Sequence, residues 1–311
     1  MDTEKKSLRR NQVKAPVFNL QRFCIHDGPG IRTTVFLKGC NLNCWWCHNP
    51  EGKQAQPQLM FYADKCLGCG ACVKICPTGA RSINNGKIVF QSNLCQQCFA
   101  CVEVCPSEAL TRCGEIKTVE EVFQEVIRDK PFYETSGGGV TVSGGEPLLY
   151  PYFVKNLFIG LRKISIPTAV ETAGSIPWEN FRIVLPWTDL FLYDLKIAEE
   201  KSLKQATGAS LPLILNNLKN LLKAGACVLI RIPLVPGFND LPVQLEKMVN
   251  LIKKIPGKFQ VELLKYNYLA SGKYRALNLT PEQTITPQQA EDSFQKAVAC
   301  FKRNRIPLVQ D

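Results

Sequence analysis

After residue 114, segments with two kinds of hydrophobic pattern alternate along the chain: short apolar runs and longer segments with helical spacing. Short runs rich in β-branched and aromatic residues predict strands at 140–143, 167–172, 190–195, 228–232 and 259–263. The longer segments between them have helical spacing and predict helices near 117–129, 152–163, 212–224 and 240–254. The last is the plainest, because one face collects Leu241, Leu245, Met248, Val249 and Ile252.

The same alternation begins earlier and ends later. A β-branched and aromatic run at 33–37 predicts a first strand, a helix is expected at 287–303, and 306–309 is a candidate for a last short strand. This gives six main βα repeats, and such alternation predicts an α/β protein with a parallel sheet. Because crossovers are right-handed, the sheet is either doubly wound or a barrel, complete or partial.

Changes in composition divide the chain into four parts. Residues 1–15 are a basic tail, and 16–60 contain the first strand and a cysteine-bearing loop. Residues 61–113 form an insert with a dense cysteine repeat, and 114–311 contain the remaining strand–helix units. The expected organisation is therefore one large domain, interrupted by a small inserted one.

The composition limits the classes of protein to which the chain can belong. The chain has 311 residues, of which 45% are hydrophobic and 21% charged, as in an ordinary soluble globular protein. No apolar run approaches the ~18 residues that a membrane span needs. The polar first 14 residues show no secretory signal. A cytoplasmic protein without a membrane partner is expected.

Cysteine usage points to metal. The chain has 15 cysteines and only two histidines, His26 and His48. In a chain of this length without an export signal, such cysteines indicate metal binding rather than disulfides. Two histidines are too few for a set of Cys/His zinc sites, so all-thiolate ligation is favoured.

The formal charge of +11 suggests nucleic acid at first sight. Thiolate-bound iron–sulfur clusters would offset it, with about −2 for each four-thiolate cluster and about −1 for a three-thiolate one. The basic residues are also scattered rather than gathered in a stripe with aromatics. No nucleic-acid partner is expected.

The most specific signal is a double cysteine run in the insert. The pattern C-x2-C-x2-C-x3-C-P occurs twice, the second copy 29 residues after the first, and is that of bacterial ferredoxins. In that pattern the fourth cysteine of each run binds the other cluster. One 4Fe–4S site is therefore expected from Cys66, Cys69, Cys72 and Cys105, and a second from Cys76, Cys95, Cys98 and Cys101. Zinc knuckles are the alternative, and the clusters either carry electrons or only staple an insert with little core.

A third set of cysteines has a different character. Cys40, Cys44 and Cys47 follow the first strand, and no fourth cysteine lies nearby. Three thiolates on a four-iron cluster leave one iron open, as a catalytic zinc keeps an open position. The amino and carboxylate groups of S-adenosylmethionine can chelate such an iron. An electron from the cluster then breaks a C–S bond and gives a radical.

Polar or Gly-rich residues follow the later strands, where parallel βα folds place their active sites. Gly144 and Gly145 would let backbone approach the ligand closely, and Lys196 would neutralise its carboxylate. Glu171 and Asp194 would accept from amino or ribose groups or hold a monovalent cation. The candidate ligand-binding positions at these strand ends are Gly144, Gly145, Glu146, Glu171, Thr172, Asp194, Leu195, Lys196, Arg231 and Asn267.

Two segments carry a family resemblance. The run from His26 to Thr33 and the cysteine triplet with Trp46, His48 and Glu51 resemble the opening of glycyl radical enzyme activating enzymes. These are radical S-adenosylmethionine proteins, and the segments 143–147, 171–174, 194–196 and 235–240 resemble their later motifs in order. The resemblance spans about residues 18–311. The insert is similar to that of the subgroup with two auxiliary clusters, which serves eliminases and decarboxylases.

The resemblance implies a partial (β/α)6 barrel with an inserted bacterial ferredoxin-like domain. It also implies that the radical takes hydrogen from a glycine of a partner enzyme, with flavodoxin or ferredoxin as electron donor. Carried over by position, Trp46, Cys47 and His48 flank the adenine, and Gly145, Asp194, Leu195 and Lys196 hold the methionine end. Asn267 stands where better-known members have a histidine.

Other readings remain open. A plain electron carrier would use the insert as its working part, and a radical enzyme acting on RNA is suggested only by the charge. A monomer is expected. Cysteines outside the three sets are expected to be small buried hydrophobes; they are Cys24, Cys113, Cys227 and Cys300.

Overall fold

The computed structural model describes residues 12–309 of the 311. The expected basic tail at 1–15 lies mostly outside the described residues, and its last two residues already belong to a strand, β1 (Lys14–Cys24). Among the described residues, no helix has both the length and the apolarity to cross a bilayer.

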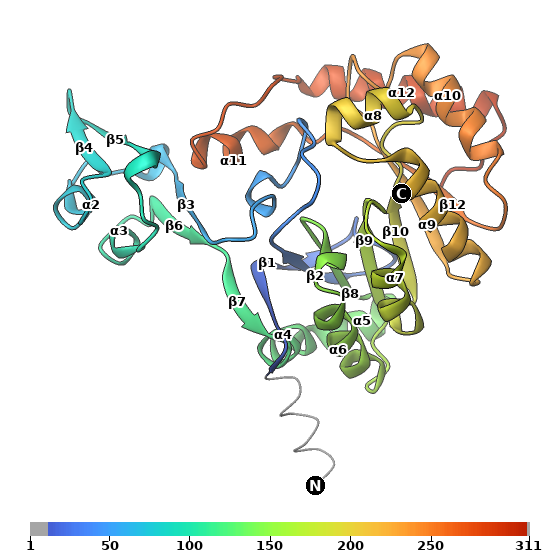
Figure 1. Cartoon of the computed structure of the whole chain (residues 1–311), viewed down its shortest axis with the longest axis horizontal. Coiled ribbons are helices and arrows are strands. Elements are labelled where there is room, and N and C mark those ends of the chain that lie inside the picture. The colour runs from blue at the N-terminus through green and yellow to red at the C-terminus, as the bar shows by residue number, and fades with distance from the viewer. Residues whose placement is uncertain (1–11, 310–311) are drawn as a thin grey trace, which may run out of the picture.

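Six parallel strands form the centre of the molecule (Figure 1). They are β2 (Arg32–Leu37), β8 (Gly139–Gly144), β9 (Thr168–Thr172), β10 (Leu190–Asp194), β11 (Val228–Pro233) and β12 (Gln260–Leu264). Each pairs in parallel with the next along the chain. This order is that of a barrel wound in one direction, and β12 is not paired with β2, so the barrel is partial. The predicted α/β fold is confirmed, and the doubly wound alternative is wrong.

Two further strands extend the sheet on the β2 side. β1 pairs antiparallel with β2, and β7 (Glu115–Thr118) pairs antiparallel with β1. Neither was expected from the sequence. The burial of β1 is irregular, with three consecutive buried residues at 15–17 and three exposed ones at 21–23, so neither a continuous apolar run nor a strict alternation marks it as a strand.

The main domain has nine helices among the described residues, most of which cover the outer face of the barrel, whereas α11 packs against Pro50–Gly52 at its rim. They are α4 (Val119–Val126), α5 (Lys130–Ser136), α6 (Pro151–Arg162), α7 (Trp178–Val184), α8 (Glu200–Thr207), α9 (Leu211–Lys223), α10 (Pro242–Lys253), α11 (Ser271–Ala276) and α12 (Pro287–Arg303). Capping boxes from Thr118 and Thr286 start α4 and α12. Two expectations are wrong: 306–309 is not a strand, and Leu241 is 48% exposed because it lies before α10 rather than on its buried face.

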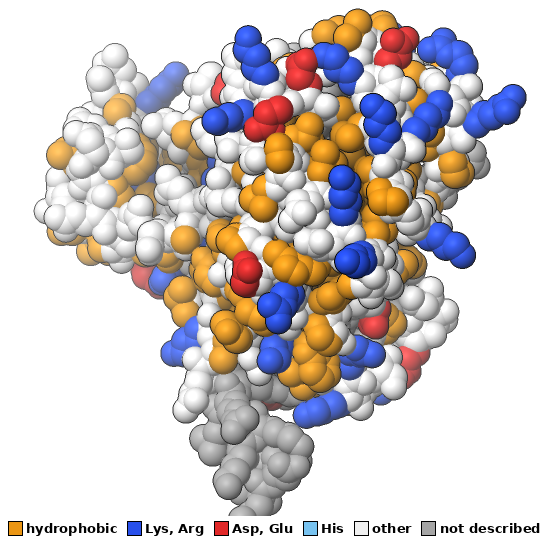
Figure 2. Space-filling model, turned by 45° about the vertical axis from the view of Figure 1, so that its right-hand side comes forward, with side chains coloured by type: hydrophobic (Ala, Val, Ile, Leu, Met, Phe, Trp, Pro, Cys, Tyr) orange, Lys and Arg blue, Asp and Glu red, His pale blue; other side chains and the backbone are white. Residues whose placement is uncertain are grey.

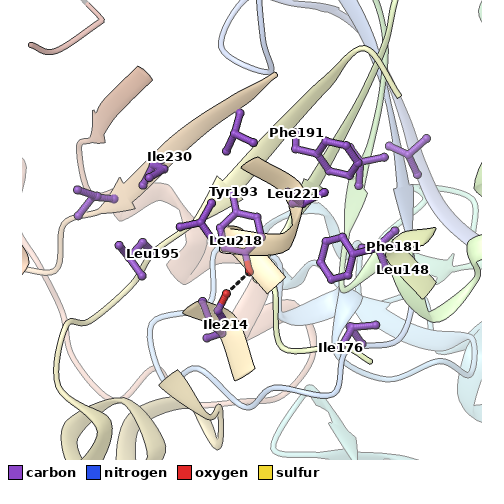
Figure 3. Close-up of a cluster of buried hydrophobic side chains, with 14 of the residues drawn as sticks. Leu148, Ile176, Phe181, Phe191, Tyr193, Leu195, Ile214, Leu218, Leu221 and Ile230 are labelled. Carbon is purple, nitrogen blue, oxygen red and sulfur yellow. Dashed lines mark hydrogen bonds between the residues drawn. The ribbon is translucent and has the colours of Figure 1, made fainter. Parts of the chain in front are cut away.

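The main core lies between the sheet and these helices. Figure 3 shows Phe181 from α7 and Ile214 from α9 packing around Tyr193 of β10. The Tyr193 hydroxyl donates to the Ile214 carbonyl at 2.7 Å, so the one polar atom of the ring is paired. Since Tyr193 points outward, its neighbours Leu192 and Asp194 point into the barrel.

Short 3₁₀ turns link the larger elements. They are η1 (Pro50–Gly52), η2 (Ala63–Lys65), η3 (Ser92–Leu94), η4 (Ile127–Asp129), η5 (Pro147–Leu149), η6 (Leu185–Trp187) and η7 (Tyr268–Ala270). Three of them, η1, η5 and η7, follow barrel strands and shape the loops at the carboxyl rim.

The insert, residues 58–113, projects to one side of the barrel (Figure 1). Its stem is the antiparallel pair β3 (Gln58–Phe61) and β6 (Leu110–Cys113), which begins three residues before the expected boundary at 61. Beyond the stem lie α2 (Ala71–Lys74), the hairpin β4 (Arg81–Asn84) and β5 (Lys87–Phe90), and α3 (Ala100–Glu103). Each cysteine run is thus a 3₁₀ turn followed by one turn of helix, as the internal repeat predicts.

Candidate active site

The loop carrying the cysteine triplet, residues 38–53 and hereafter the cysteine loop, follows the carboxyl end of β2. Two backbone bonds close it on itself, from Gly39 N–H to Gly52 O at 2.8 Å and from Cys40 N–H to Lys53 O at 2.9 Å. Cys44 is buried, and Cys40 and Cys47 are half-buried. The three thiols therefore lie on one closed loop at the barrel rim.

The loop after β8 supports the cysteine loop by close backbone contact. A Cβ on Gly145 would lie 2.1 Å from Gly39 O, and one on Gly144 would lie 2.3 Å from Leu37 O. Gly145 N–H and Glu146 N–H donate to Leu37 O and Gly39 O, both at 2.8 Å. Packing on the cysteine loop therefore already requires these glycines, and their expected contact with ligand stays a prediction.

Helix α11 holds the other side of the cysteine loop, a role that the sequence did not predict. The Tyr274 hydroxyl lies 3.1 Å from Cys47 O and 3.3 Å from Trp45 O. Lys273 Nζ donates to Asn49 Oδ1 at 2.8 Å and pairs with the buried Glu51 carboxylate at 2.6 Å. The only sequence signal was Tyr and Lys in a short polar segment, which is common on protein surfaces.

Asp194, the last residue of β10, and Lys196, just after it, form an ion pair at the same rim. Lys196 Nζ lies 2.5 Å from Asp194 Oδ2, and both side chains are 15% exposed. Burial alone would lower the pKa of Lys196, but Asp194, Cys44 and Glu171 raise it above its ordinary value. Asp194 Oδ1 is buried and accepts no hydrogen bond from any described residue. The pair thus presents a fixed cation and a free acceptor.

His48 lies beside this pair. Burial, with the Lys196 charge adding to it, lowers the pKa of His48 to about 4, so the imidazole is neutral at pH 7. Its ring meets Tyr266 edge-on, with centroids 5.3 Å apart. The buried Nε2 atom has no hydrogen-bond partner within residues 12–309. One unpaired buried polar atom, His48 Nε2, therefore belongs to the cysteine loop, and another, Asp194 Oδ1, lies at the end of β10.

Glu171 and Arg231 are tied to each other inside the barrel. Arg231 Nη1 lies 2.9 Å from Glu171 Oε1, Nε lies 2.9 Å from Glu262 Oε2, and Nη2 donates to His26 O at 2.7 Å. The Glu171 carboxylate also accepts from Ser143 Oγ. Burial raises the pKa of Glu171, and the Arg231 charge opposes that rise. The geometry thus gives Arg231 a role in holding the barrel interior.

Other expected ligand positions have partners in the protein. Glu146 accepts from Thr172 Oγ1 at 2.9 Å and from Leu148 and Ala173 N–H at 3.1 Å. Burial raises the pKa of Glu146 to about 7. Asn267 is exposed, and its side chain accepts from Leu269 N–H to start η7. For all three residues, ligand contact stays a prediction.

Leu195 and Trp46 are buried by protein. Leu195 is fully buried, and only its backbone lies at the rim, where its N–H donates to Arg231 O at 2.8 Å. Trp46 is 4% exposed and packs on Phe238 at a ring distance of 5.6 Å. Phe238 belongs to the loop after β11, where Asn239 also donates to Lys196 O at 2.9 Å. The sequence identified this loop as polar, but it did not predict that the loop positions Trp46 and Lys196.

The cysteine loop can hold an iron–sulfur cluster, because a cationic iron–sulfur core stabilises the thiolate form of its ligands. Burial raises the pKa of Cys40 to about 12 and that of Cys47 to about 11, so the thiols need a metal to become thiolates. Among the described residues, no three Cys, His, Asp or Glu side chains converge on a single metal ion. A four-iron cluster does not require that, because each thiolate binds a different iron.

In the insert, one pocket gathers the four cysteines expected at the second site. It is lined by Cys76 from the first run and by Cys95, Cys98 and Cys101 from the second, together with Arg81. The pocket therefore joins cysteines of both runs, and their binding of a cluster stays a prediction. Of the four remaining cysteines, three are buried as expected, but Cys227 is exposed because it lies in the turn before β11.

Comparison with known proteins defines the class. Residues 34–252 match the model of the Radical SAM superfamily. A radical SAM methyltransferase from Sphaerobacter thermophilus shares the fold, with a TM-score of 0.51 at 13% identity over 95% of this chain and 76% of that one.

Curated relatives identify the family within this superfamily. The chain is 38% identical to the choline trimethylamine-lyase activating enzyme of Oleidesulfovibrio alaskensis, over 95% of this chain and 97% of that protein. It is 40% identical to the trans-4-hydroxy-L-proline dehydratase activating enzyme of Clostridioides difficile, over 93% and 97%. The chain therefore belongs to the radical SAM superfamily and, within it, to the glycyl radical enzyme activating enzymes. This confirms the resemblance found in the sequence.

Proposed function

We propose that this chain activates a glycyl radical enzyme of the eliminase, dehydratase or decarboxylase type. The observation that carries the proposal is the rim of the barrel. There, three thiols on one closed loop lie beside the Asp194–Lys196 pair and the unpaired atoms of His48 and Asp194. When bound, the 4Fe–4S cluster supplies an electron that cleaves S-adenosylmethionine to methionine and a 5′-deoxyadenosyl radical, which takes hydrogen from a glycine of the partner.

The protein's own residues would bind and orient the ligand. Cys40, Cys44 and Cys47 would hold three irons of the cluster, and the fourth iron would stay open for the ligand. Lys196 stays protonated, because Asp194 raises its pKa, and it is suited to pair with that carboxylate. His48 stays neutral, so its Nε2 can accept from or donate to the adenine end without adding charge.

The insert would hold two auxiliary 4Fe–4S clusters. The pocket of Cys76, Cys95, Cys98 and Cys101 supports this, because it joins cysteines of both runs. We further infer a monomer in the cytoplasm, where thiols stay reduced, with flavodoxin or ferredoxin as donor. Zinc in the insert is the alternative, and iron and acid-labile sulfide analysis of anaerobically purified protein separates the two.

The test is electron paramagnetic resonance. Reduced protein, S-adenosylmethionine and a candidate partner enzyme should give a glycyl doublet together with 5′-deoxyadenosine. Cys44→Ser should abolish both while the insert keeps its iron. Deoxyadenosine without a glycyl doublet across the eliminases, dehydratases and decarboxylases would refute activation and leave the radical chemistry standing. Electron transfer without deoxyadenosine would favour a plain electron carrier.

The RNA alternative rests on charge alone. Figure 2 shows Lys and Arg side chains spread singly over one face, with hydrophobic side chains between them. A groove that tracks phosphates would instead gather them. Binding to tRNA that survives physiological salt would revive this alternative, because electrostatic binding alone falls steeply with salt.

A further inference from the structure

Arg81, the first residue of β4, is a buried arginine whose guanidinium makes no well-formed hydrogen bond within residues 12–309. It is 3% exposed, and none of its three guanidinium nitrogens has an oxygen or nitrogen acceptor there, while the Cys101 thiol lies close by. Its guanidinium stacks on two rings instead, 4.7 Å from the centroid of Phe90 and 5.3 Å from that of Phe61. Rings cover the faces of a guanidinium but leave its N–H groups at the edge unpaired. Burying those groups is costly unless something accepts their hydrogens.

The unpaired N–H groups lie at the second cluster site. Arg81 lines the same pocket as Cys76, Cys95, Cys98 and Cys101. The Cys101 thiol lies close enough to the guanidinium to interact with both its charge and its N–H groups. A thiolate-bound cluster in this pocket would bring the anionic sulfur acceptors that Arg81 lacks.

The internal repeat places an arginine at one of two equivalent positions, although the charge of Arg81 also reaches Cys72 of the first site. The second run repeats the first after 29 residues, so Cys76 corresponds to Cys105 and Arg81 to Leu110. Leu110 is 2% exposed and begins β6, as Arg81 begins β4. Two equivalent buried positions therefore hold a cation beside the second site and an aliphatic side chain beside the first.

We propose that Arg81 donates N–H···S hydrogen bonds to the second cluster and keeps its reduction potential above that of the first. This rests on the part of the proposed function that gives the insert two clusters. Reduction adds a negative charge to a cluster, and a neighbouring cation stabilises the reduced state more than the oxidised one. Hydrogen bonds to the sulfurs and local charge are established determinants of cluster potential. The first electron to enter the insert then rests on the cluster beside Arg81.

The experiment is a redox titration of the anaerobic protein with all clusters, followed by electron paramagnetic resonance. Arg81→Gln should weaken electron binding at one cluster about tenfold, a fall of about 59 mV in one midpoint potential. Arg112→Gln is the matched control, because Arg112 also stacks on a phenylalanine, Phe99, at 4.7 Å, but is exposed. Solvent screens its charge, so no midpoint should move comparably.

Leu110→Arg provides the reciprocal test and should raise the potential of the first cluster. If Arg81→Gln does not retain its iron, the midpoint potential of the first cluster in Leu110→Arg still tests the proposal. Unchanged midpoints in Arg81→Gln with full iron and sulfide, or equal shifts in Arg112→Gln, would overturn the inference. So would an unchanged first cluster in iron-replete Leu110→Arg. Wild-type protein with iron for the triplet cluster only would instead refute the proposed two-cluster insert itself.

Discussion

The two cysteine-bearing regions of this molecule are held in opposite ways. In the cysteine loop, Cys44 and Trp46 belong to the main hydrophobic core, and hydrogen bonds from α11 and contacts with the β8 loop fix the backbone. In the insert, Cys69 and Cys98 are exposed, and so are large apolar side chains such as Leu67 and Ile83. The protein itself shapes the first region, whereas the second has little core with which to shape itself.

This difference suits two different uses of a cluster: one in a site that must orient a substrate, and one that stabilises a small insert. Residues packed around the cysteine loop form a site that exists before iron arrives, which suits a centre that must orient a substrate. The small buried group near the insert stem contains only Met60, Cys113 and Ala276, and Ala276 comes from α11 of the barrel. Beyond the stem, the proposed clusters would therefore have to supply most of the order, as the metal does in small metal-dependent domains.

Iron removal should therefore give the largest contrast. Anaerobic chelation is expected to remove nearly all hydrogen-exchange protection from α2, the β4–β5 hairpin and α3, because their burial is too small to replace metal binding. Protection in the six barrel strands should persist. Hydrogen exchange of metal-free and iron-loaded protein measures both regions at once. Equal loss of protection in barrel and insert would show that the cysteine loop is no more preformed than the insert.

The barrel strands are the part of the fold that could be predicted from the sequence. Strands such as β8 and β11 are buried along nearly their whole length and are rich in β-branched residues. The predicted bounds of all six barrel strands lie within two residues of the observed ones. The short helices α5, α7, α8 and α11 were not predicted, because six to eight residues carry too little helical period to separate them from loops.

For the site, the sequence predicted which residues share the rim but not how they pair. Glu146 bonds Thr172 across 26 residues, and Arg231 bonds Glu171 across 60. Such pairs depend on strand register and on which face each side chain takes, which one sequence does not encode locally. For the same reason Tyr274, 227 residues after Cys47, could not be recognised as its support.

Gly145→Ala should have the largest effect among single changes to the barrel side. Its Cβ would lie 2.1 Å from Gly39 O and 2.6 Å from Gly52 O, both backbone atoms that cannot rotate away. A loss of about 3 kcal/mol or more in the free energy of unfolding is expected from such overpacking. Denaturant unfolding measures it, with Gly272→Ala as control, because nothing lies within 4 Å of that Cβ. The iron content of the insert should be unchanged. A parallel loss of iron from the insert would show that the cysteine loop and the insert are not held independently.

Glu146 should make the stability of the barrel depend on pH. Burial raises its pKa from 4.5 to about 7 in the fold, so the folded protein binds more protons than the unfolded chain between these values. Stability is therefore highest below the unfolded pKa and falls by roughly 2–3 kcal/mol as pH rises to about 7. Denaturant unfolding of metal-free protein from pH 5 to 8 should show this slope in wild type and not in Glu146→Gln. Identical slopes would mean that Glu146 is ionised throughout.

Tyr274→Phe should have the smallest effect and the most local one. It removes the hydroxyl bonded to Cys47 O and Trp45 O, while the ring still fills its buried place in α11. One lost hydrogen bond of this kind corresponds to about 1 kcal/mol. Because the freed carbonyls belong to the cysteine loop, the change should appear as weaker S-adenosylmethionine binding and faster iron loss from the triplet cluster. Tyr152→Phe, which alters an exposed tyrosine of α6, should change neither property. If Tyr274→Phe instead released iron from the insert, α11 would support the insert through Ala276 more than it supports the cysteine loop, and the two regions would be less independent than their packing indicates.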